Sequence, residues 1–199
     1  ATCYMDTSSN AAISLAADFT IETFAYMPAT ASGAYSIFDF RTAAGARFVL
    51  AVVNGKLYIL EEGNGITNRE TYGPSTVTNN TWHHIAVSRS GSTLRVFLNG
   101  NLEITTTNNI SYTGHALRIG ANILNASAKY VGYLDEMRVS NGTARYTTGF
   151  TPPAAAFSLG AQDLTLIGSN YATYTVPTKA SVSLLVKSTN GAITPNTNL

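Results

Sequence analysis

Gly132–Pro153 has the sequence GYLDEMRVSNGTARYTTGFTPP and carries the strongest fold signal in this 199-residue chain. Its first half alternates apolar and polar residues, which is typical of a β-strand. Its second half is rich in aromatic and turn-forming residues and closes on Thr151-Pro152-Pro153. A strand that is followed directly by such a turn-rich segment favours an all-β domain.

Short strand patterns recur along the chain with turn signals between them. Asn54-Gly55 and Asn99-Gly100 each separate two such patterns, and Asn-Gly favours the positive φ angles of a tight hairpin turn. Pro28 is expected to stop one strand, and Ser9–Ala17 has room for one helical turn. Without a long helix between strands, the pattern predicts an antiparallel sandwich. We expect strands at 19–22, 35–40, 48–53, 56–61, 93–98, 101–106, 116–121 and 130–139.

Composition and charge exclude several function classes. The chain is 45% hydrophobic and 12% charged, with a net charge of +1 and no cluster of Lys or Arg. Binding to nucleic acid needs such clusters, so it is not expected. The longest apolar run, Phe48–Val53, is too short to cross a membrane. Cys3 is the only cysteine, so no internal disulfide is possible.

Together with DFTIETFAYMP (Asp18–Pro28) and TWHHIAVSRSGSTLRVFLNG (Thr81–Gly100), the opening segment resembles a known family. This family is the laminin-G-like jelly roll of the concanavalin A-like lectin/glucanase superfamily, and the resemblance covers Ala1–Pro153. It implies a jelly-roll β-sandwich in which Trp82 and His84 open a core strand. The Ala144–Pro153 ending is most similar to versions of the domain in bacteriophage tail and virion proteins.

The chain is expected to divide near residue 153. Residues 1–153 form the sandwich, and residues 154–199 form a strand-rich C-terminal extension. Three short strands are predicted there, at 164–168, 171–176 and 181–187. Three strands of this length barely make a stable sheet alone, so we expect them to extend the sandwich or to pair with a partner.

No catalytic constellation is evident, and an enzyme is not expected. Retaining glycosidases of this superfamily place two carboxylates on one strand face, about 5 Å apart. Glu61-Glu62 and Asp135-Glu136 are adjacent pairs, whose members face opposite ways on a strand. His83 and His84 are adjacent too, so they cannot share one metal ion from the same strand.

Several residues are expected to have structural roles. Alternation predicts that Asp135 lies on the apolar face with Tyr133, Met137 and Val139, as a hydrogen-bonded structural carboxylate, with a ligand contact as the alternative. Glu136 and Arg138 are expected to form a surface pair on the other face. In Ala144–Pro153, Tyr146 and Phe150 are predicted to anchor the segment along an edge of the sandwich.

Calcium binding and sugar binding are both kept as alternatives to purely structural roles. No cofactor is expected, although relatives hold calcium at the sandwich rim with hard oxygen ligands. The weak candidates here are Asp39, Asn122 and Asn125, for which an ordinary strand Asp and turn Asn are the simpler alternative. Sugar binding needs aromatic platforms and polar side chains. The candidates for sugar contacts are Tyr35, Tyr72, Tyr112, His115, Asn122, Asn125 and Tyr130, although strand-end tyrosines often pack at a sandwich rim.

The sequence therefore leads to a non-enzymatic virion structural protein, as a capsid decoration, fibre or tail-associated protein on the virion surface. Its expected partners are other virion proteins or copies of itself. The alternative is an adhesin domain that recognises cell-surface polysaccharide, with calcium as a possible aid. A hydrolase, the third hypothesis, requires two carboxylates on one concave face.

Overall fold

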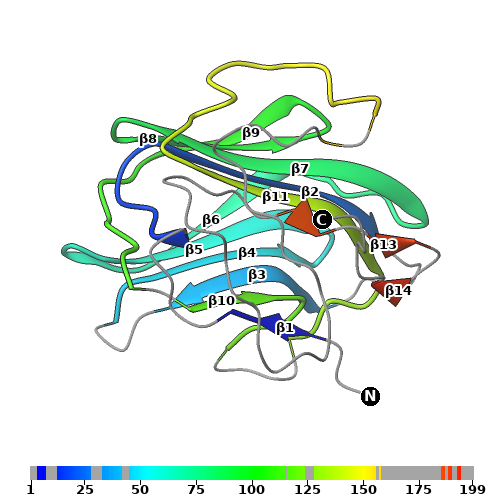
Figure 1. Ribbon diagram of the computed structural model, residues 1–199, viewed down its shortest axis with the longest axis horizontal. Helices are drawn as coiled ribbons and strands as arrows, with labels where there is room; N and C mark the ends of the chain where they lie inside the picture. The colour runs from blue at the N-terminus through cyan, green and yellow to red at the C-terminus, as the bar shows by residue number, and fades with distance from the viewer. Residues whose placement is uncertain are drawn as a thin grey trace, which may run out of the picture.

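Two antiparallel sheets packed face to face make up the computed structural model of this chain (Figure 1). The structure describes residues 4–7, 13–27, 33–41, 45–114, 116–123, 128–155 and 157. It also describes the backbone of 185–186, 188–189 and 192–193. None of these residues forms an α-helix. The predicted antiparallel jelly-roll sandwich is confirmed.

The first sheet has six strands in the order β1-β10-β3-β4-β5-β6. Its strands are β1 (Met5–Asp6), β3 (Ala34–Arg41), β4 (Arg47–Val53), β5 (Lys56–Gly63), β6 (Ile66–Thr76) and β10 (Ala116–Ile119).

The second sheet also has six strands, in the order β12-β11-β2-β7-β8-β9. Its strands are β2 (Phe19–Met27), β7 (Thr81–Ser90), β8 (Thr93–Leu98), β9 (Asn101–Thr107), β11 (Tyr133–Asn141) and β12 (Leu185–Val186). A separate ribbon pairs β13 (Ser188–Thr189) with β14 (Ala192–Ile193).

The hydrophobic core fills the space between the two sheets. On β2, Phe19, Ile21 and Ala25 alternate toward the core and are fully buried. Phe38 on β3 and Phe48 on β4 meet them from the first sheet, with their ring centroids 5.7 Å apart. This period-2 burial fixes which face of each strand points outward.

Asn-Gly turns connect the hairpins as predicted. Asn54 and Gly55 have φ angles of 50° and 74°, and Asn99 and Gly100 have 51° and 79°. These values suit the tight turn expected from the sequence. A third turn of this kind, Asn64-Gly65, joins β5 to β6, a strand that the sequence analysis did not predict.

Along one side of the sandwich, β6 of the first sheet lies beside β9 of the second. The Arg69 guanidinium donates to the Thr107 carbonyl over 2.6 Å, and the Ser75 amide donates to the Glu103 carboxylate over 3.0 Å. These bonds join the two sheets where their edge strands meet.

A β-bulge interrupts β11 and overturns the predicted alternation. Asp135 pairs with Phe24, but Arg138 pairs with Glu22, so the register shifts between them, and Glu136 has a φ angle of 50°. The extra residue moves Met137 to the core face, while Asp135 stays on the outer face. Asp135 is half-buried, and its Oδ1 accepts the Glu136 amide over 2.9 Å. The prediction that it shares the apolar face with Met137 and Val139 was wrong.

The exit segment, defined here as residues 143–153, crosses the outer face of the second sheet instead of following an edge. It appears above β7 and β8 in yellow in Figure 1, and the Phe150 amide donates to the Gly100 carbonyl over 3.0 Å. Within it, the rings of Tyr146 and Phe150 stack 3.6 Å apart, and both lie against Phe97 of β8. The predicted edge location was wrong because the segment packs on β2, β7 and β8.

At the C-terminal end, β12 pairs with β11 through Met137↔Val186 and Arg138↔Leu185. It lies within the strand predicted at 181–187, whereas those predicted at 164–168 and 171–176 fall outside the described residues. Residues 9–12 of the segment predicted to have room for a helical turn are also outside them. The domain boundary at 153 stays a prediction. In the described part of the chain, no helix has the length and apolar character to cross a membrane.

Candidate functional site

The outer face of the second sheet has two parts with different chemistry. One part lies under the exit segment and contains a buried polar network. The other part is uncovered and presents aromatic rings. Both are built from the even-numbered residues of β2 and β7, whose odd-numbered neighbours face the core.

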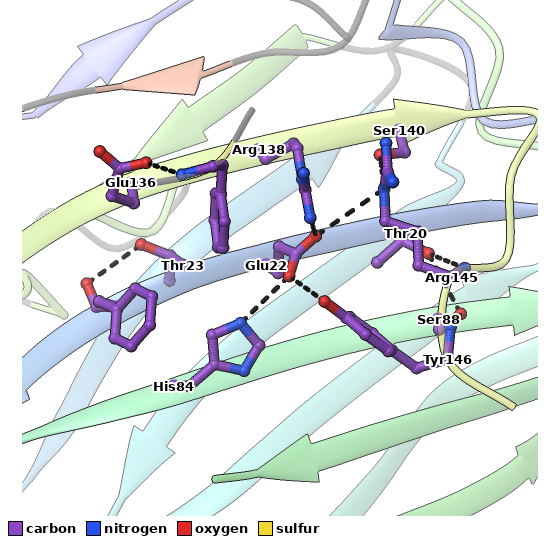
Figure 2. Close-up of polar contacts among 12 residues, drawn as sticks. Thr20, Glu22, Thr23, His84, Ser88, Glu136, Arg138, Ser140, Arg145 and Tyr146 are labelled. Atoms are coloured by element: carbon purple, nitrogen blue, oxygen red, sulfur yellow. Dashed lines mark hydrogen bonds and ion pairs between the residues drawn. The ribbon is translucent and has the colours of Figure 1, made fainter. Parts of the chain in front are cut away.

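Glu22 is the centre of the buried network, and its residue is 1% exposed (Figure 2). Its Oε1 accepts Nε and Nη2 of Arg138 over 2.8 and 2.6 Å. Its Oε2 contacts His84 Nε2 over 3.1 Å and accepts the Tyr146 hydroxyl over 2.7 Å. A buried carboxylate needs such compensation, and here β7, β11 and the exit segment supply it.

Further bonds tie the exit segment to the sheet beside Glu22 (Figure 2). The Arg145 amide donates to Thr20 Oγ1 over 2.8 Å. That hydroxyl in turn donates to the Thr143 carbonyl over 2.9 Å. The Tyr146 amide donates to Ser88 Oγ over 3.3 Å. These contacts bury Phe97 of β8 beneath the stacked rings of the exit segment.

His84 is enclosed by aromatic rings. Phe24 lies 4.9 Å from it, Phe150 5.6 Å and Phe157 6.1 Å, measured between ring centroids. Within the described part of the chain its Nδ1 has no hydrogen-bond partner, so the contact with Glu22 goes through Nε2 alone. His84 is therefore buried among aromatic rings on the outer face of β7.

Glu22 and Arg138 correct two sequence-based expectations. The alternation of apolar and polar residues over 19–22 is typical of a strand with one exposed face, yet Glu22 is buried because the exit segment covers it. The expected surface pair of Glu136 and Arg138 was wrong as well. Arg138 is buried against Glu22, and Glu136 accepts the Phe157 amide over 2.7 Å.

Burial alone would raise the pKa of Glu22. The hydrogen bond to His84, the charge of Arg138 and the bond from Tyr146 outweigh burial and hold its pKa below the ordinary value. Burial and the Glu22 charge raise the pKa of the Tyr146 hydroxyl, which therefore stays a donor. The network is thus suited to a carboxylate that stays ionised at neutral pH.

Acid should weaken the fold through Glu22. Since its folded-state pKa is lowered, its contribution is complete above the unfolded pKa and is lost as pH falls below about 4.3, toward the folded pKa. We expect the stability difference between the wild type and Glu22→Gln to shrink over this window. Urea unfolding at several pH values measures it, and a difference that stays constant with pH would contradict the assignment.

The uncovered part carries an aromatic row, defined as Tyr26, Trp82 and Tyr133. These residues are directly paired across β11, β2 and β7, so their side chains lie side by side. The Tyr26 ring centroid is 5.6 Å from that of Trp82 and 5.7 Å from that of Tyr133. Trp82 is 47% exposed and Tyr133 52% exposed. Trp82 opens β7 as implied, but its side chain lies outside the core.

Those sugar-binding candidates that the structure describes do not gather into one site. Tyr112 is fully buried, with its hydroxyl accepting Asn108 Nδ2 over 2.8 Å, so it cannot contact a ligand. Tyr35 packs against the core, and Tyr72 is exposed beside Tyr58 on the other sheet. Tyr130 is half-buried and donates to the Tyr26 carbonyl over 3.0 Å. His115 and Asn125 lie outside the described residues.

The calcium candidates Asp39 and Asn122 do lie near each other, but an arginine stands between them. Arg41 Nε donates to both carboxylate oxygens of Asp39 over 3.0 and 2.9 Å, and its Nη2 donates to Asn122 Oδ1 over 3.2 Å. The Ile123 amide donates to Asp39 as well. A guanidinium already supplies the positive charge, so these described residues do not fit a calcium ion.

The strand carboxylates that could serve a hydrolase have separate partners. Asp39 pairs with Arg41, Glu61 with Arg69, Glu62 with Arg47, Glu70 with Tyr58, and Glu103 with the Ser75 amide. In the part that the structure describes, no three His, Cys, Asp or Glu side chains form a metal-binding group. Neither observation supports hydrolysis.

The sequence analysis did not predict the aromatic row, although a local signal for it exists. Ile85 and Val87 place the odd positions of β7 in the core, so Trp82 must face outward. The same parity on β2, where Ile21 and Ala25 are buried, places Tyr26 outward. Counting parity from the core residues would have found two of the three rings.

Comparison with protein families gives one match, to a model described as concanavalin A-like lectin/glucanases superfamily, over residues 2–147. No curated protein matches the sequence.

Solved structures with a similar fold include domains LG4-5 of the mouse laminin α1 chain. The TM-score is 0.55 at 14% identity, over 73% of this chain and 42% of that one. A protein from Bacteroides ovatus, whose description names carbohydrate binding, has a TM-score of 0.55 at 16% identity, over 72% and 42%. This chain thus spans less than half the length of either relative, and at this identity the likeness concerns the fold.

Proposed function

This chain belongs to the concanavalin A-like lectin/glucanases superfamily, in its laminin-G-like branch, and from that premise we propose that it is a non-enzymatic carbohydrate-binding module. The observation that carries the proposal is the aromatic row. Family membership alone does not choose between adhesion, catalysis and structural roles, because one fold hosts many functions.

Exposed aromatic rings in a row are chemically suited to sugars. The CH groups on a pyranose face pack against an aromatic ring, while tyrosine hydroxyls and the indole NH can bond to sugar hydroxyls. Trp82 and Tyr133 leave about half of their surface in solvent although burial would stabilise them. Large apolar groups kept exposed side by side indicate a contact surface.

Trp82→Ala should weaken glycan binding at least about tenfold, since an exposed aromatic side chain that anchors a ligand is typically worth more than about 1.4 kcal/mol. The change removes an exposed ring, so the thermal midpoint should move little. Affinity electrophoresis in gels that contain soluble polysaccharides, followed by titration calorimetry, measures the loss.

Two matched controls separate the row from exposed apolar surface in general. Leu102→Ala removes a 48% exposed side chain from β9 of the same sheet, and Tyr72→Ala removes an exposed ring from the first sheet. Both should leave binding unchanged. Equal losses in all three variants would contradict the assignment of the row, and a loss confined to Tyr72→Ala would return the site to the first sheet.

We propose the virion structural role separately, with other virion proteins or further copies as partners and the virion surface as location. Its support is the resemblance of the Ala144–Pro153 ending to phage versions of the domain. Labelled chain added to particles that lack it, and in parallel to host cells, tests this role. Saturable binding to particles favours assembly, whereas saturable binding to cells alone rejects it.

A further inference from the structure

The three rings of the aromatic row do not form one plane. Tyr26 is tilted by 61° from Trp82 and by 55° from Tyr133. The central ring is also less exposed than the two that flank it. A flat crystalline polysaccharide needs several coplanar rings to contact at once. Tilted rings instead suit one chain, whose successive sugar units can turn to meet each ring.

On the described strand faces around the row, no exposed cation is placed to recognise acidic sugars. Carboxylate and sulfate groups are bound by Arg or Lys, often through paired hydrogen bonds. On the described outer faces of β2, β7 and β11, Arg138 is the one cation, and it is buried against Glu22. Lys129 precedes β11, and its backbone forms a bridge with Ala121, so its backbone lies beside the first sheet and not on these outer faces.

The nearest charged side chain on the Tyr133 face of β11 is itself acidic. Asp135 pairs with Phe24, the residue next to Tyr26 on that face, and its Oδ1 accepts the Glu136 amide. A carboxylate at this position repels an anionic ligand at short range. The charge pattern therefore discriminates against acidic glycans, whereas a neutral sugar is unaffected.

We infer that Tyr26, Trp82 and Tyr133 select uncharged sugars on a single soluble chain, and reject acidic glycans and flat crystalline polysaccharide. This selectivity rests on the proposed carbohydrate-binding function, and it adds the ligand class to it.

The test compares three sets of probes with the full chain and with Trp82→Ala. The first set is neutral and soluble, namely β-glucan, xyloglucan, galactomannan and arabinoxylan. The second set is acidic, namely alginate, hyaluronan and polysialic acid, and the third is microcrystalline cellulose in a pull-down. We expect at least one neutral glycan to bind at least about tenfold more tightly than every acidic one. We expect no retention on cellulose, and loss of neutral binding in Trp82→Ala.

A gain-of-function variant tests the reason for the selectivity. Val131, two residues before Tyr133, is 51% exposed, so Val131→Lys adds a cation near the row and removes no ring. It should increase binding of the acidic probes severalfold at low salt, and added salt should reverse the increase. Leu102→Lys adds the same charge on β9 and should not increase it.

The outcomes distinguish failure of the sugar selectivity from failure of the proposed carbohydrate binding. Acidic or crystalline probes that bind as tightly as neutral ones, and do so through Trp82, overturn the selectivity and leave carbohydrate binding in place. If Val131→Lys binds the acidic probes no more tightly than the wild type does, the absence of a nearby cation is not the cause of the selectivity. If no probe binds through Trp82, both proposals fail. A change of oligomeric state in Trp82→Ala also rejects them, because the row is then a protein interface.

Discussion

Glu22→Gln is expected to lower the free energy of unfolding by about 3–5 kcal/mol, the usual cost of removing one partner from a buried ion pair. Glutamine keeps the shape of the side chain but leaves the Arg138 guanidinium without its counter-charge in a dry site. It also weakens the bonds from His84 and Tyr146. Because Tyr146 belongs to the exit segment, this segment should loosen together with the fold. Urea unfolding followed by circular dichroism measures the loss.

Glu62→Gln is the matched control for this substitution. Glu62 also pairs with an arginine, but its Oε2 is 3.7 Å from Arg47 Nη1 and its side chain is 30% exposed. Exposed pairs contribute little, so this change should cost less than about 1 kcal/mol. Equal effects at the two positions would show that Glu22 is accessible to solvent.

A double variant tests whether the cost at Glu22 comes from an orphaned charge. Glu22→Leu combined with Arg138→Met removes both charges, and paired replacement of buried ions by apolar groups is often neutral. We expect the double variant to be more stable than Glu22→Gln, although His84 and Tyr146 also lose their acceptor. A double variant that is less stable than the single one would mean that the hydrogen bonds outweigh the ion pair.

The sequence predicts the hairpins well because their signals are local. Asn54-Gly55 and Asn99-Gly100 require positive φ angles that few other dipeptides adopt, and the structure has those angles. The strand β6 was missed because Ile66–Thr76 is an edge strand with mostly exposed residues and hence no clear apolar alternation. Its signal is the preceding Asn64-Gly65 turn, which follows the same rule.

The polar network could not be predicted from local pattern. Glu22 and Tyr146 are 124 residues apart in sequence and meet only because the exit segment returns across the sheet. An alternating strand predicts one buried face, but it does not tell whether a distant segment covers the other face. The bulge in β11 likewise depends on Glu136 in a left-handed conformation, which its residue type does not indicate. Its consequence is that parity counted from Tyr133 fails beyond Asp135.

Gly100→Ala is expected to lower the free energy of unfolding by about 2–5 kcal/mol. About 1–2 kcal/mol of this is the strain of a Cβ at positive φ, and the rest is the cost of forcing an atom into packed space. A Cβ at Gly100 would overlap the Phe150 carbonyl oxygen and lie 2.9 Å from its carbonyl carbon. The exit segment must then move away from the turn, and the bond from the Phe150 amide to Gly100 must break.

Gly55→Ala is a close control, because Gly55 occupies the same position in the other predicted Asn-Gly turn, with a φ angle of 74° against 79°. A Cβ there would meet only Thr76 Cγ2, at 3.9 Å, which is ordinary contact. This variant should lose only the strain, about 1–2 kcal/mol. Hydrogen exchange at the Phe150 amide should accelerate in Gly100→Ala and stay slow in Gly55→Ala. Equal losses of stability in the two variants, with equal protection of the Phe150 amide, would show that contact with the Gly100 turn does not hold the exit segment in place. The contacts of Tyr146 would then be what keeps the segment over Glu22.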